Sequence, residues 1–570
     1  MSQALKDLYQ EELAKLRVWG SEFSRDNPAL APMLGAKGDD PDVERLLEGV
    51  AFMSSLVRKS INDGFPDLVQ SLLRLVCPSA LQPVPSLTIM AFKPVRGFAE
   101  SLLVPAGAAL ASIPVDGVSA KFTTTTPLTV LPAAITKVEV EDGRGGEGSI
   151  SLTVTSAAPL KSWASNTLVF HLAGDYPEAC ERRRVLLRRI KTVEIESQGV
   201  VFDLGPESLG LWGFGPEERA LPNQLLLAFN LIQEYFVSPQ KLMFLKVTGL
   251  KVLSENTNQS FIIRFRLANL AAPLAPARAE DFILNAVPAI NVFSHPAHPL
   301  VVDHKSNEYL LKPQDQEAEK LGVFSVEEVV SRGVDGETRV FQPFETFRKK
   351  NQWLYRVIRR ISPITGQGEY YLSFLYSKDH KPILETITAS LKCHNGSLTD
   401  SLRTGEINLP TDTSPSMVSF ANIIPPTRAC PPIDSDWRLW RFISHLQVNI
   451  NPTMTVEGLK EILNLHAQPN DPDLGRVLSN TKRIEAVEEL SIKLEDYFLK
   501  GRPYRGSRVE LTVDPQGFAS TGDLGLFGEV LDHFFGLFHQ INVYSRLVIK
   551  LKNVGRDLTW PPRLGVKRLT

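Results

Sequence analysis

The chain has 570 residues, of which 43% are hydrophobic and 22% charged, so it has the composition of a globular protein with room for two to four domains. A formal net charge of −2 leaves no overall basic field for nucleic acid and no acidic tail. No segment approaches the roughly 18 apolar residues of a membrane span, and the N-terminus is charged where a signal peptide would be apolar. The four cysteines are far apart and form no CxxC pair, as expected for a reducing compartment, so we expect a cytoplasmic protein without a zinc knuckle.

The first 86 residues are predicted to form a helical hub of three helices. The first helix carries an apolar stripe with charged residues in between, formed by Leu5, Leu8, Tyr9, Leu13, Leu16, Gly20 and Phe23. The second is predicted to begin with Asp40 as the N-cap and Pro41 at the first helical position, where the missing N–H costs nothing. Asn62 to Gly64 are expected to end it, and Pro66 to start the third helix.

The second helix has apolar side chains on more than one face. Its main stripe recurs at steps of three and four and is expected to be core: Val43, Leu46, Leu47, Val50, Met53, Val57 and Ile61. Phe52 and Leu56 lie nearly opposite that stripe, on a face that the chain's own fold need not cover. We therefore predict that Phe52 and Leu56 contact another protein.

From Leu87 the hydrophobic period changes from about 3.6 to about 2, and β-forming residues become frequent. We predict a sandwich-like or barrel-like module over residues 87–205, a Gly/Pro-rich connector with a helix over 206–242, and a second β-rich module over 243–426. Residues 427–570 return to mixed helices and strands. The predicted class is α+β: an N-terminal helical hub, then β-rich modules, then a mixed α/β C-terminal domain.

Three motifs resemble catalytic or ligand-binding sites. Gly143, Gly145 and Gly148 spell G-x-G-x-x-G, but the glycines connect two predicted strands, whereas a phosphate site needs a helix after them. The histidines at 295, 298 and 304 have a metal-like count but lie in a proline-containing loop, so we favour ordinary loop histidines. Cys393 and His394 are neighbours on a predicted strand and point to opposite faces, so we favour a buried cysteine over a thiolate pair.

The strongest basic cluster is ERRRVLLRRIK, which could bind phosphates or an acidic protein surface. We favour a solvated strand edge, where positive charge discourages edge-to-edge pairing, and protein contact as the next reading. The candidate contact residues are Arg182, Arg183, Arg184, Arg188 and Arg189. No segment combines a nucleophile, a base and an oxyanion hole, so no enzyme and no cofactor are expected.

Several segments, taken in order along the chain, carry a resemblance to a known family. They include LYQEELAKLRVWGSEFSRDNPALAPML, DPDVERLLEGVAFM, LIQEYFVSPQKLMFL and LFGEVLDHFFGLFHQINVYSRLVI. In these segments the chain resembles TssF, also called VasA or ImpG, of the type VI secretion baseplate. That family is similar to the gp6-type wedge protein of contractile phage tails.

The resemblance implies a non-catalytic scaffold. Two copies would join one TssG into a wedge through a bundle of helices, and TssE and TssK would complete it. The wedges would surround the VgrG spike hub, promote sheath assembly and reach the membrane complex through TssK, at the inner face of the inner membrane.

Other readings stay open at this point. One is a metal-dependent hydrolase using the loop with His295, His298 and His304. Another is a baseplate protein of a different contractile injection system. A nucleic-acid binder centred on the basic cluster is the third, and it predicts steeply salt-dependent binding.

Overall fold

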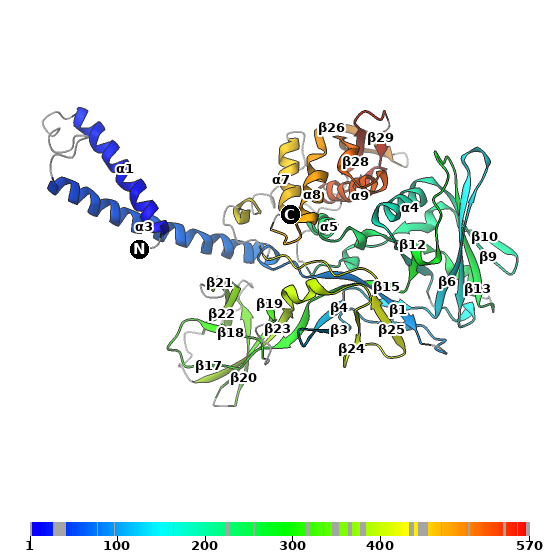
Figure 1. The fold of residues 1–570 in the computed structure, drawn as a ribbon, viewed down its shortest axis with the longest axis horizontal. Helices are drawn as coiled ribbons and strands as arrows, with labels where there is room; N and C mark the ends of the chain where they lie inside the picture. The colour runs from blue at the N-terminus through cyan, green and yellow to red at the C-terminus, as the bar shows by residue number, and fades with distance from the viewer. Residues whose placement is uncertain are drawn as a thin grey trace. The chain divides into compact units, whose positions relative to one another are not determined.

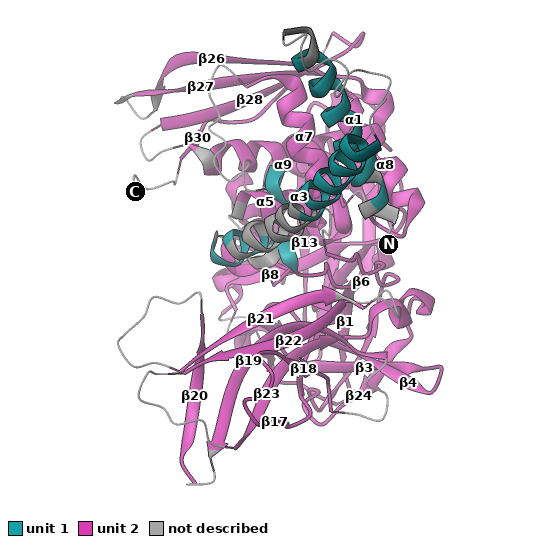
Figure 2. Ribbon diagram, turned by 90° about the vertical axis from the view of Figure 1, so that its left-hand side faces the viewer, with its two compact units in different colours: residues 1–81, 434–444 teal, residues 82–433, 445–570 magenta. Residues whose placement is uncertain are grey.

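The computed structural model describes residues 3–565 except 27–40, 77, 96, 164, 223–226, 255–256, 315–319, 334–335, 345–352, 363–367, 377–383, 433–437, 443–453, 469, 500–501, 540–542 and 556 (Figure 1). The chain divides into two compact units (Figure 2). Unit 1 comprises residues 1–81 and 434–444, and unit 2 comprises residues 82–433 and 445–570.

The N-terminal part of unit 1, residues 1–81, contains two long helices and a short 3-10 turn in its described residues. They are α1 (Gln3–Asp26), α3 (Pro41–Val76) and η2 (Pro78–Leu81). Helix α3 begins at Pro41, as predicted, whereas the expected N-cap Asp40 lies outside the described residues.

The predicted helix break at Asn62–Gly64 is wrong, because α3 is one helix of 36 residues. Asparagine, aspartate and glycine are weak helix formers, but each costs only about 1 kcal/mol or less in a helix interior. The apolar pattern also continues in phase across the expected break, with Ile61, Phe65 and Leu68 spaced by four and three residues. That unbroken phase was the sequence signal for a single helix.

Unit 2 begins with an antiparallel sheet of order β24-β3-β4-β15-β1-β25. Its strands are β1 (Leu87–Pro94), β3 (Ala109–Val115), β4 (Val118–Thr124), β15 (Ala286–Ile290), β24 (Ile407–Pro410) and β25 (Val418–Asn422). Strand β1 pairs Leu87 with Ile290 and Met90 with Asn422. This sheet therefore combines strands from both of the β-rich ranges that the sequence pattern separates.

Two further antiparallel sheets enclose the largest core of unit 2. One has the order β10-β9-β13-β7-β6 and the other the order β11-β12-β8-β14. The strands are β6 (Ala133–Asp142), β7 (Gly148–Ser156), β8 (Thr167–Leu172), β9 (Ile190–Ser197), β10 (Val200–Asp203), β11 (Leu209–Leu211), β12 (Phe244–Thr248), β13 (Ser260–Leu267) and β14 (Phe282–Leu284).

A curled sheet of order β16-β23-β19-β20-β21-β22-β18 follows, with β17 also paired to β23. Its strands are β16 (Phe293–Pro296), β17 (Leu300–Val302), β18 (Tyr309–Leu311), β19 (Gly322–Gly333), β20 (Thr338–Pro343), β21 (Leu354–Ile361), β22 (Gly368–Leu375) and β23 (Glu385–His394). The small pair β2 (Leu102–Val104) and β5 (Leu128–Val130) completes the β-rich part.

The C-terminal part is mixed α/β. Strands β26 (Val487–Leu499), β27 (Arg502–Val513), β28 (Val543–Leu551), β29 (Asp557–Thr559) and β30 (Arg563–Leu564) form its sheet. Strands β27 and β28 are parallel, and α9 (Thr521–Phe538) supplies the crossover that a parallel pair needs. The helix predicted around residues 437–446 is described only at residues 438–442, which belong to unit 1.

Four helices pack into the large core of unit 2 around α9. Besides α9 they are α4 (Tyr176–Arg189), α5 (Leu227–Val237), α7 (Val456–His466) and α8 (Leu474–Glu485). Helix α5 was predicted, and Phe229, Ile232 and Phe236 on it are buried, whereas Leu225 lies outside the described residues. Helical, β-rich and mixed parts follow one another along the chain, so the α+β class is confirmed.

Candidate assembly surface

Helices α1 and α3 pack against each other (Figure 1). Ala51 and Ser55 of α3 are fully buried, and Leu13 of α1 is buried as well. Glu44 of α3 forms an ion pair with Arg17 of α1. Because successive helix residues are rotated by about 100°, positions 44, 51 and 55 lie on one side of α3, and this side faces α1.

Five large apolar side chains of α3 lie on the remaining side, and we call this side the outer face of α3. Their exposed fractions are 69% for Leu46, 62% for Met53, 44% for Val50, 39% for Phe52 and 38% for Leu56. At about 100° per residue they form one continuous arc opposite the side that faces α1. A contiguous exposed apolar surface of this kind is typical of a protein contact site.

The expectation that the main stripe is core is wrong for Leu46, Val50 and Met53, which are exposed. Leu47 is half-buried, and the side chains of Val57 and Ile61 lie outside the description. Hydrophobic periodicity reports that a helix has an apolar face, but it does not report what covers that face. Small residues allow the closer approach of α1, so the larger side chains are left outside.

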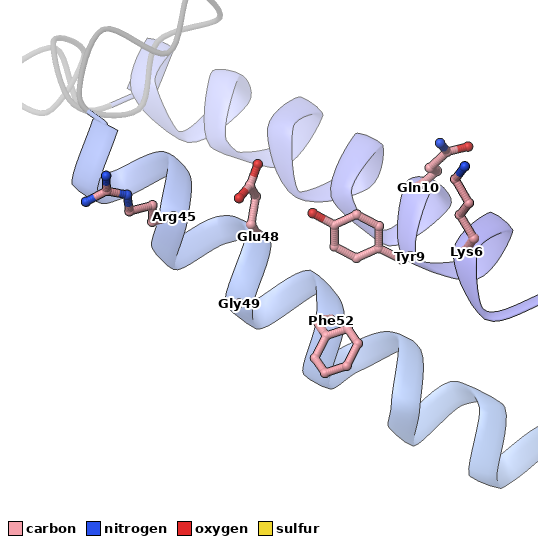
Figure 3. Close-up of a pocket in the computed structure, with 7 residues that line it drawn as sticks. All are labelled: Lys6, Tyr9, Gln10, Arg45, Glu48, Gly49 and Phe52. Atoms are coloured by element: carbon pink, nitrogen blue, oxygen red, sulfur yellow. The ribbon is translucent and has the colours of Figure 1, made fainter. Parts of the chain in front are cut away.

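A pocket of about 510 Å³ lies between the two helices, at the edge of this outer face. Figure 3 shows Tyr9 and Phe52 beside it, with Arg45 towards one end and Lys6 towards the other. Gln10, Glu48 and Gly49 complete the lining. No side chain projects from Gly49, so the backbone of α3 is open to solvent there.

Exposed apolar side chains extend beyond the outer face of α3. On α1 they are Val18, Trp19 and Phe23, and near the C-terminal end of α3 they are Leu72 and Leu75. Trp19 is 61% exposed, which is unusual for so large an apolar side chain in a protein that functions alone. Of this surface, only Phe52 and Leu56 were predicted from the sequence to contact another protein, because Leu46, Val50 and Met53 were expected to be core.

The basic cluster is not a strand edge, so that prediction is wrong. Its arginines lie on helix α4, where Ala179, Cys180, Arg183 and Leu186 are buried at helical spacing. A short apolar run between charges does not distinguish a helix from a strand. The spacing of three and four residues between the buried positions was the sequence signal that favoured a helix here.

Most of these arginines bind partners within the chain. Arg182 pairs with Asp281 at 3.0 Å, and Arg183 pairs with Glu529 of α9 at 2.7 Å while its Nε donates to the Leu242 carbonyl. Burial alone would raise the pKa of Glu529, but Arg183 holds that pKa below its ordinary value. Both arginines therefore stabilise the fold of unit 2 through contacts within the chain.

The other three arginines are more accessible. Arg184 pairs with Glu181 on its own helix. Arg188 is exposed, donates to the Thr559 carbonyl at 2.6 Å and lies over the Trp560 ring. Arg189 ends α4, and its carbonyl accepts from the Ala268 N–H. Contact with another protein therefore stays a prediction for Arg184, Arg188 and Arg189 only.

The three loop histidines do not converge. His295 lies on β16 with Nε2 3.1 Å from the Gln314 carbonyl, His298 is exposed, and His304 has a positive φ of 57° and packs against Tyr376. Among the described residues, no group of three or more His, Cys, Asp or Glu side chains is placed to hold a metal ion. The structure thus gives the proposed hydrolase no metal centre in the described part of the chain.

The other two motifs are structural. The glycine-rich motif is the hairpin between β6 and β7, with the 3-10 turn η3 (Arg144–Gly146) at its tip, as predicted. Cys393 is fully buried on β23, as predicted, and burial raises the pKa of its thiol to about 12. Burial also lowers the pKa of His394 to about 4, so the pair is a neutral thiol beside a neutral imidazole at neutral pH.

Comparison with known proteins agrees with the resemblance. The curated type VI secretion system component TssF1 of Pseudomonas aeruginosa is 23% identical over 625 residues, covering 99% of each chain. A chain in the cryo-electron microscopy structure of the TssK-TssF-TssG baseplate subcomplex superimposes with a TM-score of 0.77 at 25% identity, over 91% of this chain and 98% of that one.

A chain in a structure of the baseplate complex from the type VI secretion system has the same fold, with a TM-score of 0.61 at 22% identity over 99% of this chain and all of that one. In the part of the chain that is described, no helix is long and apolar enough to cross a membrane. The family model for the type VI secretion system protein TssF matches residues 1–567. This chain therefore belongs to the TssF family of the type VI secretion system.

Proposed function

We propose that this chain is a structural, non-catalytic subunit of a type VI secretion baseplate and that the outer face of α3 is where it joins TssG. The observation that carries the proposal is the contiguous exposed surface with Leu46, Val50, Phe52, Met53 and Leu56. Its spacing of three and four residues suits packing against other helices. Membership of the TssF family supports the same assignment.

In this proposal two copies of the chain and one TssG form a wedge, as the family resemblance implies. TssE and TssK join it, and wedges assemble around the VgrG spike. A solved relative was seen in a baseplate subcomplex with TssK and TssG, which supports those two partners. The chain itself stays in the cytoplasm, and TssK links the baseplate to the membrane complex at the inner face of the inner membrane.

The same surface would serve a baseplate protein of another contractile injection system, but the full-length match to a type VI family favours the type VI machine. The hydrolase reading receives no support from His295, His298 and His304. His295 contacts the Gln314 carbonyl and His304 packs against Tyr376, so the three side chains do not share one site.

Co-expression with the neighbouring baseplate genes tests the proposal. The wild-type chain should co-purify with TssG, and a chain with both Phe52→Asp and Leu56→Asp should not. As a control, Val301→Asp places the same charge on an exposed apolar residue of β17 in unit 2, and it should co-purify normally. If the double variant retains TssG, the outer face of α3 is not the TssG site.

A further inference from the structure

Gly49 has no structural role that the fold of the described chain explains. It lies in the interior of α3, where glycine is less favourable than alanine or any other residue except proline. It is not among the glycines with a positive φ. A Cβ built at this position has no atom within 4 Å, so close packing within the chain does not require glycine either. The missing side chain leaves room for something else.

The space beside Gly49 is a socket with apolar walls. We use the name socket for the pocket lined by Lys6, Tyr9, Gln10, Arg45, Glu48, Gly49 and Phe52. The rings of Tyr9 and Phe52 stand on either side, from α1 and α3 (Figure 3). The charged groups are at the rim, where Lys6, Arg45 and Glu48 are all exposed. The apolar interior can therefore be filled without burying those charges.

The surroundings of the socket indicate a helix as its occupant. Leu46, Val50 and Met53 are spaced by four and three residues, which is the spacing of a coiled-coil seam. These exposed side chains continue the apolar surface along α3 beside Gly49. A small molecule would fill the socket and leave this surface uncovered, whereas a helix would cover both. In helix packing, a side chain of one helix inserts into a hole formed by residues of its neighbour.

We propose that the socket at Gly49 receives one bulky apolar side chain from a helix of TssG and so fixes the register of that helix on α3. This inference rests on the proposed function, because it requires that TssG binds the outer face of α3.

Replacing Gly49 tests the inference, because the position is open in the free chain. Gly49→Ala should preserve or raise the melting temperature of the chain, since no neighbour lies within 4 Å and helix propensity improves. Gly49→Leu should also fold, but its side chain projects into the socket and occupies the space beside the α3 backbone, so affinity for TssG should fall by at least about tenfold. The matched control is Ala14→Leu, an exposed alanine of α1 outside the socket, which should bind TssG normally.

Rescue gives a second measurement. TssG variants, each with alanine in place of one bulky apolar residue of a helix, are co-expressed with Gly49→Leu. The variant that lacks the inserted side chain should restore co-purification. Unchanged affinity of Gly49→Leu would overturn the socket inference, and so would equal loss with Ala14→Leu. If Phe52→Asp with Leu56→Asp also leaves TssG bound, the proposed function fails as well. If that double variant loses TssG while Gly49→Leu keeps it, only the socket inference fails.

Discussion

Two adjacent positions of α3 should respond in opposite ways to the same change. Ala51 is fully buried against α1, whereas Phe52 is 39% exposed on the outer face. Ala51→Asp places a carboxylate at a fully buried position between two helices, and an uncompensated buried charge costs about 3–5 kcal/mol. Phe52→Asp with Leu56→Asp changes two positions that are 39% and 38% exposed, where the introduced carboxylates can remain hydrated, so the cost in stability should be smaller than for Ala51→Asp.

This difference in cost allows an effect on folding to be distinguished from an effect on assembly. Domains are stable by only about 5–15 kcal/mol, so Ala51→Asp removes a large part of the stability of the helix pair. The double variant should keep its helical circular dichroism and its solubility and should lose only TssG. For the same reason Val50→Asp, at an exposed position, should behave like the double variant rather than unfold the chain.

The assay compares the yield of soluble protein, far-ultraviolet circular dichroism and co-purification of TssG for the three variants. Aggregation of the double variant when it is expressed alone would show that Phe52 and Leu56 belong to the core. A soluble, helical Ala51→Asp variant that still binds TssG would refute the assignment of the α1–α3 contact. Either result would reverse the inner and outer sides of α3.

Three further predictions concern unit 2. Phe534→Ala removes a fully buried ring 5.7 Å from the Phe229 ring, so it should lower the free energy of unfolding by about 3–5 kcal/mol, and an unchanged melting temperature would contradict this. Burial raises the pKa of Asp532 to about 6 despite its pair with Arg563, so the folded pKa lies above the unfolded one. As pH rises from about 4 to about 6, the wild type should therefore lose up to about 3 kcal/mol of stability relative to Asp532→Asn, as measured by denaturant unfolding. His298→Ala should leave secretion intact, and lost secretion at normal protein levels would argue against a purely structural role.

The order of helical, β-rich and mixed parts follows from the changing hydrophobic period of the sequence, because period and turn residues act over short distances. Strand pairing does not follow from them. Strand β1 pairs with β15 and β25, about 200 and 330 residues later in the chain, and alternation within a strand does not name its partner. This is why the β-rich ranges predicted at 87–205 and 243–426 share a sheet.

The basic cluster shows a second limit of the sequence pattern. Six positive charges in ten residues suggested exposure, but exposure depends on partners that are distant in the sequence. Asp281 and Glu529 lie about 100 and 350 residues after the arginines that they neutralise. Arg182 and Arg183 are consequently buried, as charged groups are when a partner and hydrogen bonds compensate them.

On α3 the apolar residues were identified correctly from the sequence, but most of them were assigned to the core although they are exposed. Large apolar side chains are usually inside, so the stripe with Leu46, Val50 and Met53 was assigned to the core and only the opposite face to a partner. The helix pair uses Ala51 and Ser55 inside instead, because small side chains bring α1 close. Between residues 46 and 56 of α3, Ala51 and Ser55 face α1 and the larger side chains face outward, so in the proposed wedge this stretch would bury its apolar surface against a partner. Gly49 lies exposed in the middle of that outward side, and the open space beside it is consistent with the proposed packing of another helix there.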